Sequence, residues 1–218
     1  EPTNVNQIGD TIKIGRRGSF TGSLIVKGIQ GHVGYPDLAE NPINSLLKML
    51  EPFSKIYLDK GTNEFQPSSV MVTTIDVNND ASNVIPGEVK AKFNIRFNTL
   101  HSVASLKSML KKQFDAITKN YEFDYFCNAE PFLTSDEELK STLQNAITKV
   151  VNVNPEKSTT GGTSDARFIT KLCPVIEFGL VGKTMHKIDE NVEVEDIMKL
   201  TNIYNKFLHN YFRVEKND

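Results

Sequence analysis

This chain has few cysteines, almost no net charge and no long apolar run, and each shortage excludes a class of protein. No apolar run approaches the roughly 18 residues that span a bilayer, and no signal-peptide pattern opens the sequence. The net charge is −2, with Lys and Arg spread along all 218 residues, so nothing resembles the basic footprint of a nucleic-acid-binding protein. The two cysteines, Cys127 and Cys173, lie far apart in apolar contexts, which favours buried thiols in a reducing compartment. We therefore expect a cytoplasmic protein with one large domain or two small ones.

The beginning of the chain is abrupt. The stretch EPTNVNQIGDTIKIG has no initiating Met and enters a loop and then a strand directly. Such a start predicts that further sequence precedes it, with a processed mature terminus as the alternative.

Residues 19–130 show strand and helix patterns in the order βαββαβ. Apolar alternation predicts the strands, and helical spacing behind Asn41-Pro42 and behind Ser102 predicts two helices, each with one apolar face. For the first helix we expect that face to contain Ile43, Leu46, Leu47 and Leu50. The expected strands are residues 19–28, 70–77, 88–97 and 121–126. This order predicts a ferredoxin-like α/β domain, whose edge strands can pair with another subunit.

The pattern changes after Pro131. Ser135 is expected to cap a helix, with Glu138 completing a capping box. A helix after Gly162, a strand over 174–179 and a last helix over 194–212 follow. These elements contain too few strands for a sheet of their own, so we expect them to complete a sheet whose other strands lie elsewhere.

The most informative stretch is residues 158–191. The loop STTGGTSD offers backbone N–H groups and hydroxyls at a predicted helix start, a combination that suits anion binding. His186 follows the expected strand and precedes acidic residues, where α/β folds place metal ligands or acid–base groups. An ordinary surface histidine is the alternative, and surface positions are also expected for His101 and His209.

Several segments together resemble the M20 family of dinuclear-zinc amidohydrolases. They are IGRRGSFTGSLIVKGIQGHVGYPDLAENPI, NVIPGEVKAKFNIRF, GGTSDARF and MHKIDENV, in one collinear order covering nearly the whole chain. The resemblance implies that residues 1–18 end a first catalytic segment, 19–130 form a lid (dimerisation) domain, and 131–218 form the C-terminal segment of an α/β zinc-peptidase-like catalytic domain. Most of the metal site would lie in sequence preceding this chain.

The resemblance also implies an activity. Family members use two zinc ions, with cobalt as the alternative metal, and form a homodimer through the lid. The implied reaction splits N-succinyl-LL-2,6-diaminopimelate, a small succinylated amino acid, into succinate and LL-2,6-diaminopimelate, with neither nucleic acid nor membrane as a partner. Alone, this chain would be inactive. The alternatives are another deacylase such as acetylornithine deacetylase, a carboxypeptidase, or a non-catalytic dimerisation module.

Three residues match the family's catalytic machinery. Glu1 corresponds to a ligand of the first metal and His186 to a ligand of the second. His32, in GHVGYP, matches the histidine that hydrogen-bonds the oxyanion in the partner subunit's active site. A solvated terminal residue and a loop histidine are the alternatives for Glu1 and His32.

Other residues match substrate contacts of the family. Arg16 is expected to bind a carboxylate, with Arg17 serving the hinge, although the two are hard to separate. Tyr35 is expected to contact the substrate, with a purely packing role as the alternative. For Arg96, the alternative is a charged residue on the surface of a strand. Gly182 departs from the pattern, since some family members have an Asn there. The full expected set is Arg16, Ser19, Tyr35, Asn83, Arg96, Gly162, Thr163 and Ser164.

Overall fold

A computed structural model describes residues 1–213 of the chain, which form two compact units. One unit is Arg17–Pro131, and the other combines Glu1–Arg16 with the residues from Phe132 onward. The assignment of residues 1–18, 19–130 and 131–218 to lid and catalytic segments stays a prediction. None of the helices in the described part of the chain has the length and apolar character needed to cross a membrane.

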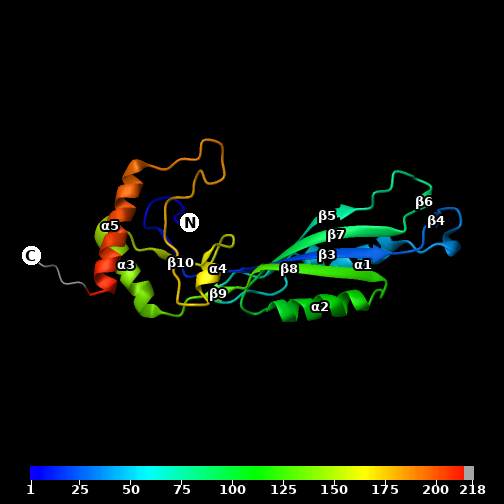
Figure 1. Cartoon of the computed structure of the whole chain (residues 1–218), viewed down its shortest axis with the longest axis horizontal. Helices are drawn as coiled ribbons and strands as arrows, with labels where there is room; N and C mark the ends of the chain where they lie inside the picture. Colours follow the sequence, from blue (N-terminus) through cyan, green and yellow to red (C-terminus); the bar gives the residue numbers. More distant parts are fainter. Residues whose placement is uncertain (214–218) are drawn as a thin grey trace, which may run out of the picture. The chain divides into compact units, whose positions relative to one another are not determined.

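The unit Arg17–Pro131 is an antiparallel sheet covered by two helices (Figure 1). The strands lie in the order β5-β7-β3-β8, and every neighbouring pair is antiparallel. Along the chain the main elements are β3 (Gly18–Lys27), α1 (Pro42–Leu50), β5 (Ser69–Asp76), β7 (Glu88–Phe97), α2 (Val103–Asp115) and β8 (Tyr121–Ala129). This order and this arrangement confirm the predicted ferredoxin-like α/β fold.

The two faces of this sheet have different compositions because side chains alternate along each strand. One face and the helices bury a core rich in phenylalanine, including Phe20, Phe93 and Phe114, none of which is exposed to solvent. The opposite face is mostly polar, although Met71 and Phe126 are exposed on it, and it contains Ser19 and Arg96 directly across from each other on β3 and β7.

The helices of this unit begin as the sequence predicts. The Asn41 side chain accepts a hydrogen bond from the N–H of Ile43 at 3.0 Å and caps α1, while Ser102 caps α2 in a capping box with Ser105. The predicted apolar face of α1 is wrong in one place. Leu47 is 56% exposed, and Met49 is buried instead.

Short elements complete this unit. The 3₁₀ turns η1 (Pro36–Leu38) and η2 (Glu51–Lys55) flank α1, and β4 (Gly31–His32) pairs antiparallel with β6 (Val84–Ile85). This small β4–β6 ladder places the segment around His32 beside the segment around Asn83.

The second unit has two short strand pairs and two long helices. β1 (Thr11–Lys13) runs parallel to β10 (Glu156–Ser158), and β2 (Gly15–Arg16) pairs antiparallel with β9 (Phe132–Leu133). Its helices are α3 (Glu137–Val151), the single turn α4 (Ala166–Ile169) and α5 (Val194–Tyr211). The long helices bury Ile147 and Ile203 against Ile12 of β1 and Phe178, which is one continuous core.

Two predictions in this unit are wrong. Asp136, and not Ser135, caps α3, because its Oδ1 accepts the N–H of Leu139 at 2.8 Å. The expected strand over 174–179 is reduced to one antiparallel bridge between Glu177 and Lys13. An apolar run needs a partner along its length to form a strand, and the described residues provide one only at Glu177.

Two predictions of burial are also corrected. Cys173 is exposed and is not a core thiol, whereas Cys127 is half-buried and packs against the core of the unit Arg17–Pro131. His101 is not a free surface residue, since its Nε2 lies 3.1 Å from Oδ2 of Asp59 and its side chain is 17% exposed. His209 is exposed, as expected.

Candidate active-site pocket

The second unit contains a pocket of about 470 Å³ that gathers residues from three separate stretches of the chain. The stretches are the N-terminal segment, the loop after β10 and the loop before α5. Among the lining residues are Glu1, Lys13, Arg16, Gly162, Thr163 and His186. Five of these, Glu1, Arg16, Gly162, Thr163 and His186, were expected at an active site from the sequence.

The N-terminal segment is joined by hydrogen bonds to the stretch that leads to His186. The N–H groups of Thr3 and Asn4 both donate to the carbonyl of Leu180, at 3.1 and 3.2 Å. Asn4 Nδ2 also donates to the carbonyl of Gly179 at 2.5 Å, and both Thr3 and Asn4 are buried. Glu1 is therefore positioned at the pocket beside the segment that leads to His186.

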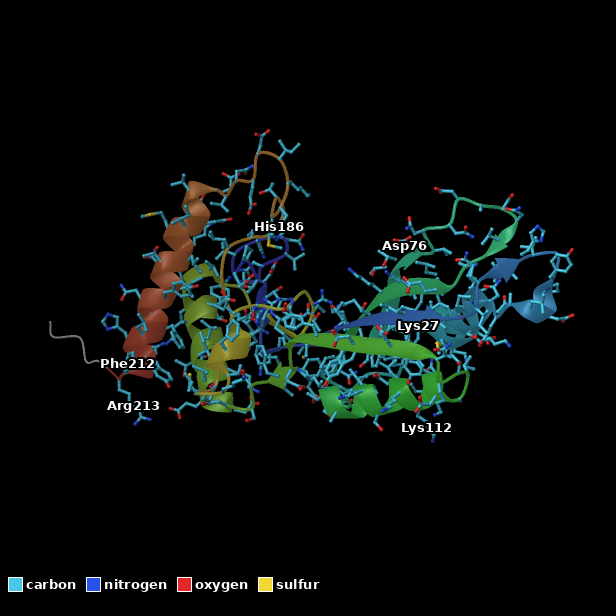
Figure 2. All side chains as sticks on the ribbon, turned by 45° about the vertical axis from the view of Figure 1, so that its right-hand side comes forward. Lys27, Asp76, Lys112, His186, Phe212 and Arg213 are labelled. Atoms are coloured by element: carbon cyan, nitrogen blue, oxygen red, sulfur yellow. The ribbon has the colours of Figure 1, made fainter. Side chains whose placement is uncertain are left out.

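His186 lies on a tightly turned loop before α5 (Figure 2). Thr184 closes the loop, because its hydroxyl donates to the carbonyl of Asn191 at 2.8 Å and accepts the N–H of Asn191 at 3.0 Å. The His186 N–H donates to Oε2 of Glu190 at 3.0 Å, and its φ of 62° lies in the left-handed region. Non-glycine residues rarely adopt that conformation, and those that do gather at functional sites.

Glu1 and His186 fit the donor chemistry of zinc but are too few for a complete site. Carboxylate and neutral imidazole are both zinc ligands, and both residues line this pocket. A catalytic zinc usually has three protein ligands. Within residues 1–213, no group of three or more His, Cys, Asp or Glu side chains is arranged to hold a metal.

Arg16 contributes a positively charged side chain to the lining of the pocket. Arg16 Nε donates to Oε2 of Glu177 at 2.6 Å, and Nη1 donates to the carbonyl of Gly162 at 3.3 Å. Arg16 Nη2 is buried without a hydrogen-bond partner in the described chain. The loop backbone can lie this close to the Arg16 guanidinium because residue 161 is a glycine. Gly161 has a φ of 102°, and a Cβ there would lie 2.8 Å from Arg16 Nη1. The free guanidinium edge is a ready donor for a carboxylate.

The loop after β10 supplies the other expected donors, although not in the way that the sequence predicts. The following helix, α4, has only four residues, so its dipole contributes little to anion binding. Ser164 is 4% exposed and its Oγ is buried without a partner among the described residues, while Gly162 and Thr163 line the pocket. The attraction for an anion therefore comes from individual donors and from Arg16.

Two charged residues were not expected from the sequence: Lys13, which lines this pocket, and Glu177, which pairs with Arg16. Lys13 is 6% exposed, and its Nζ donates to the hydroxyls of Ser158 and Thr160 at 2.9 and 2.8 Å. Burial, and after it the nearby Arg16, lower the pKa of Lys13. Glu177, the partner of Arg16, is 8% exposed. The available signal was a single charged residue inside each of two apolar runs, IKI and VIEFG.

A second group of expected residues gathers in the unit Arg17–Pro131. His32, Tyr35 and Asn83 lie close together, since the His32 and Tyr35 rings are 5.8 Å apart and the Val33 N–H donates to the carbonyl of Asn83 at 3.0 Å. All three are exposed. The N–H of Gly34 donates to His32 Nδ1 at 3.0 Å, so in the neutral ring the proton resides on Nε2. Nε2 is therefore a hydrogen-bond donor that faces solvent.

Ser19 and Arg96 form a third group on the polar face of the same unit. They are paired across β3 and β7, and Asn94 Nδ2 donates to the hydroxyls of Ser19 and Thr21 at 3.2 and 2.9 Å. Arg17 belongs to this unit, where its Nη1 donates to the carbonyl of Pro67 at 3.1 Å. The two consecutive arginines therefore belong to different units. Arg16 lines the pocket, and Arg17 bonds within the unit Arg17–Pro131.

The chain matches known proteins along nearly all of its length. The model of a peptidase dimerisation domain from the M20 family matches residues 14–122. Succinyl-diaminopimelate desuccinylase of Pelagibacter ubique is 52% identical over 97% of this chain and 56% of its own length. The enzyme of that name from Parvibaculum lavamentivorans is 49% identical over 97% of this chain and 55% of its own length. The chain therefore spans about half the length of these relatives.

Solved structures share the fold at low identity. An aminopeptidase of Bacillus cereus superposes with a TM-score of 0.79 at 15% identity, covering 96% of this chain and 56% of its own. An M20 family metallo-carboxypeptidase of Sulfolobus solfataricus superposes with a TM-score of 0.76 at 16% identity, covering 98% of this chain and 63% of its own.

Proposed function

This chain belongs to the M20 peptidase family, and we propose that it provides the lid and part of the metal site of an enzyme that hydrolyses N-succinyl-LL-2,6-diaminopimelate to succinate and LL-2,6-diaminopimelate. The observation that carries the proposal is the 52% identity to a succinyl-diaminopimelate desuccinylase over 97% of the chain. The pocket supports it, because the donors of Arg16 and Ser164 suit a carboxylate and lie in the same unit as the candidate metal ligands.

Glu1 and His186 are proposed as ligands of two zinc ions, one ligand for each ion, with cobalt as an alternative. The chemistry that zinc supplies when bound is polarisation of the amide carbonyl and a lowered pKa for water. Within this chain, Glu1 is held at the pocket by the bonds of Thr3 and Asn4, and His186 by its tightly closed loop. Two ligands do not make a catalytic site, so the isolated chain is expected to bind zinc weakly and to be inactive.

Arg16, Gly162, Thr163 and Ser164 are proposed to bind the substrate within this pocket. Arg16 Nη2, Ser164 Oγ and Arg167 Nε are the buried side-chain donors of this unit that have no hydrogen-bond partner among the described residues. A buried donor without a partner costs free energy, and an incoming carboxylate removes that cost by accepting a hydrogen bond from it. These residues would thus hold the substrate while the amide lies at the end of the pocket nearer Glu1 and His186.

His32 is proposed to donate a hydrogen bond to the oxyanion that develops on the amide carbonyl. Its neutral ring is a donor at Nε2, because Nδ1 is already occupied by the N–H of Gly34. Such a donor stabilises the transition state more than the bound substrate, and so acts on kcat. By resemblance to the family, His32 serves the site of a partner subunit, and Tyr35, Asn83, Ser19 and Arg96 add further contacts to the substrate.

A homodimer through the lid is proposed as the functional assembly. The match of residues 14–122 to a peptidase dimerisation domain supports it. The sheet ends in β5 on one side and β8 on the other, and strands at a sheet edge can pair isologously across a two-fold axis. Sedimentation of the chain at high micromolar concentration tests this proposal, and a strictly monomeric chain would contradict it.

The experiment that tests the proposed reaction uses a chimeric enzyme. In the Pelagibacter ubique enzyme, the region that matches this chain is replaced by this chain, and succinate release is measured with and without added zinc. Zinc-dependent hydrolysis is the expected result. A folded chimera that binds zinc but releases no succinate would contradict the proposal, and the parent enzyme under the same conditions is the control.

A further inference from the structure

The backbone around Asn4 connects the stretch that carries Glu1 with the stretch that leads to His186. Asn4 forms a parallel bridge with the facing stretch, and its carbonyl accepts the N–H of Gly182 at 3.0 Å. The carbonyl of Gly182 in turn accepts the N–H of Met185, the residue before His186, at 3.2 Å. The backbone that places His186 is therefore bonded to the backbone that places Glu1.

The side chains of Thr3 and Asn4 join the same stretches to the residues at the start of β1. The Thr3 hydroxyl accepts the N–H of Gly179 at 3.0 Å and donates to the carbonyl of Thr11 at 3.3 Å. Asn4 Nδ2 donates to the carbonyl of Gly179. Asn4 Oδ1 accepts the N–H groups of Gly9 and Thr11, at 3.1 and 3.0 Å. Because Thr3 and Asn4 are buried, at 4% and 3% exposure, these bonds are shielded from water and hold one geometry.

Gly179 allows the two stretches to lie very close together. It is buried, and a Cβ at this position would lie 2.0 Å from the carbonyl oxygen of Glu1. No side chain fits in that space, so only a glycine lets Glu1 keep its position. Gly182, further along the same stretch, has more room, because a Cβ there would lie 3.4 Å from its nearest neighbour, the Cβ of Pro2. The position of Glu1 therefore depends on residue 179 and not on residue 182.

We propose that Thr3, Asn4 and Gly179, the N-terminal clamp, are positioning residues that set the separation between Glu1 and His186. The inference rests on the proposed function, since it concerns the ligands of the same two zinc ions. The clamp acts through those ligands, because the recorded bonds of the Thr3 and Asn4 side chains all go to the protein backbone. Replacing residues that orient metal ligands typically changes metal affinity by about 10–100-fold.

The first test compares two alanine substitutions in the chimeric enzyme. Gly179→Ala should displace Glu1 and raise the zinc dissociation constant about 10–100-fold, measured by competition with a chelator. Gly182→Ala is the matched control, because it adds the same methyl group to the same stretch at a place with room for it. It should stay within about threefold of wild type. An unchanged zinc affinity in a folded Gly179→Ala enzyme would overturn the proposal.

A second pair of variants separates positioning from a general loss of stability. Thr3→Val replaces the clamp hydroxyl by a methyl group. Thr134→Val does the same to another buried threonine of this unit, whose hydroxyl donates to the carbonyl of Val175. Both should lower the stability to urea, but only Thr3→Val should weaken zinc binding at least about tenfold.

The conservative variant Thr3→Ser keeps the hydroxyl and should restore zinc affinity to within about threefold of wild type. Failure of this rescue in a folded enzyme would count against the hydroxyl as the acting group and would overturn the role of Thr3. Equal weakening of zinc binding by Thr3→Val and Thr134→Val would show that Thr3 only supports the fold, and would overturn it as well.

If neither clamp variant folds, the wild-type chimera decides the question. Because coupling between two sites is reciprocal, zinc must slow amide hydrogen exchange at Gly179 and Gly182, whose N–H groups bond to the clamp. The N–H of Leu139, bonded to Asp136 at the start of α3, is the reference and should not change. Equal protection of all three amides, or of none, would overturn the proposal. None of these measurements uses succinate release, so a chimera that binds zinc without hydrolysis would contradict the proposed reaction and not the clamp.

Discussion

Arg16 and Glu177 form a buried ion pair that leaves half of the guanidinium free. Arg16 Nε lies 2.6 Å from Glu177 Oε2, and each side chain is 8% exposed. Nη1 donates to the carbonyl of Gly162 at the pocket that also contains His186, and Nη2 is buried without a partner among the described residues. The pair thus links the stability of this unit to the orientation of its proposed carboxylate-binding residue.

Removing one partner of this pair should be costly. Glu177→Ala leaves a buried cation unpaired and should lower the free energy of unfolding by about 3–5 kcal/mol. Replacing both partners, as in Arg16→Met with Glu177→Met, removes the charges together and should cost less than Glu177→Ala alone. Urea denaturation of the chain measures both effects, with the exposed Glu156→Ala as a control expected within about 0.5 kcal/mol of wild type. A Glu177→Ala variant as stable as the control would contradict this role.

The stability of the unit Arg17–Pro131 should depend on pH through Asp59. Burial alone would raise the pKa of Asp59, but hydrogen bonds from Ser68, Gly61 and Asn98 outweigh it and lower the pKa. A lowered folded pKa means that this stabilisation is complete above the usual pKa of about 3.9 and is lost as pH falls through the folded pKa.

The variant Asp59→Asn should therefore be less stable than wild type at neutral pH, and the difference should shrink as the pH is lowered from about 5 toward 3. Urea unfolding at several pH values measures this, with the exposed Asp80→Asn as the matched control. A difference between wild type and Asp59→Asn that stays constant over that range would show that the Asp59 charge does not contribute.

The first turn of α3 offers a test of two neighbouring residues. The N–H of Leu139 donates to Asp136 Oδ1 at 2.8 Å, so Asp136→Ala should destabilise the chain by about 1 kcal/mol. Ser135→Ala is the control and should have little effect, because Ser135 lies before the cap. Thermal unfolding distinguishes the two, and a larger loss from Ser135→Ala would reverse the assignment.

Local patterns in the sequence were sufficient for the ferredoxin-like unit. The expected strand at 88–97 has the same bounds as β7. One face of β7 packs on the core and the other does not, so apolar and polar residues alternate along the strand and mark its length in the sequence. The capping residues Asn41 and Ser102 were also readable from the sequence, since a cap acts over only three residues. The cap of α3 was placed one residue early, where two adjacent side chains could each cap.

The second unit was harder to predict because its strand pairs and ion pairs join residues that are distant in sequence. The run at 174–179 is apolar like a strand, but only Glu177 finds a bridging partner in the described chain. At the pocket, motif resemblance identified Arg16, Ser164 and His186. It did not identify Glu177, which is 161 residues from Arg16 and becomes its partner only in the folded chain.

Replacing His186 or His32 in the chimeric enzyme should lower its activity for two different reasons. His186→Ala removes a proposed metal ligand and should lower zinc content together with activity. His32→Ala should leave zinc content unchanged and lower kcat by about 10²–10³, since it removes one oxyanion donor. Metal analysis beside steady-state kinetics separates the two, and loss of zinc in His32→Ala would contradict the assignment.

The same variants test whether His32 acts across the dimer. Mixing His32→Ala and His186→Ala chimeras, followed by subunit exchange, creates dimers in which one site has both an intact His186 and an intact His32 from the partner subunit. Partial recovery of activity is expected. If verified mixed dimers stay inactive, His32 acts within its own chain or outside catalysis.

The most direct test of the central claim is the selectivity of the chimera between two acyl groups. The ratio of kcat/KM for N-succinyl-LL-2,6-diaminopimelate to that for its N-acetyl counterpart is measured with saturating zinc. The account predicts a ratio of at least about 100, since a site with buried charged donors discriminates strongly against a ligand that leaves them unpaired. A ratio near one, or a preference for the acetyl substrate, would contradict it.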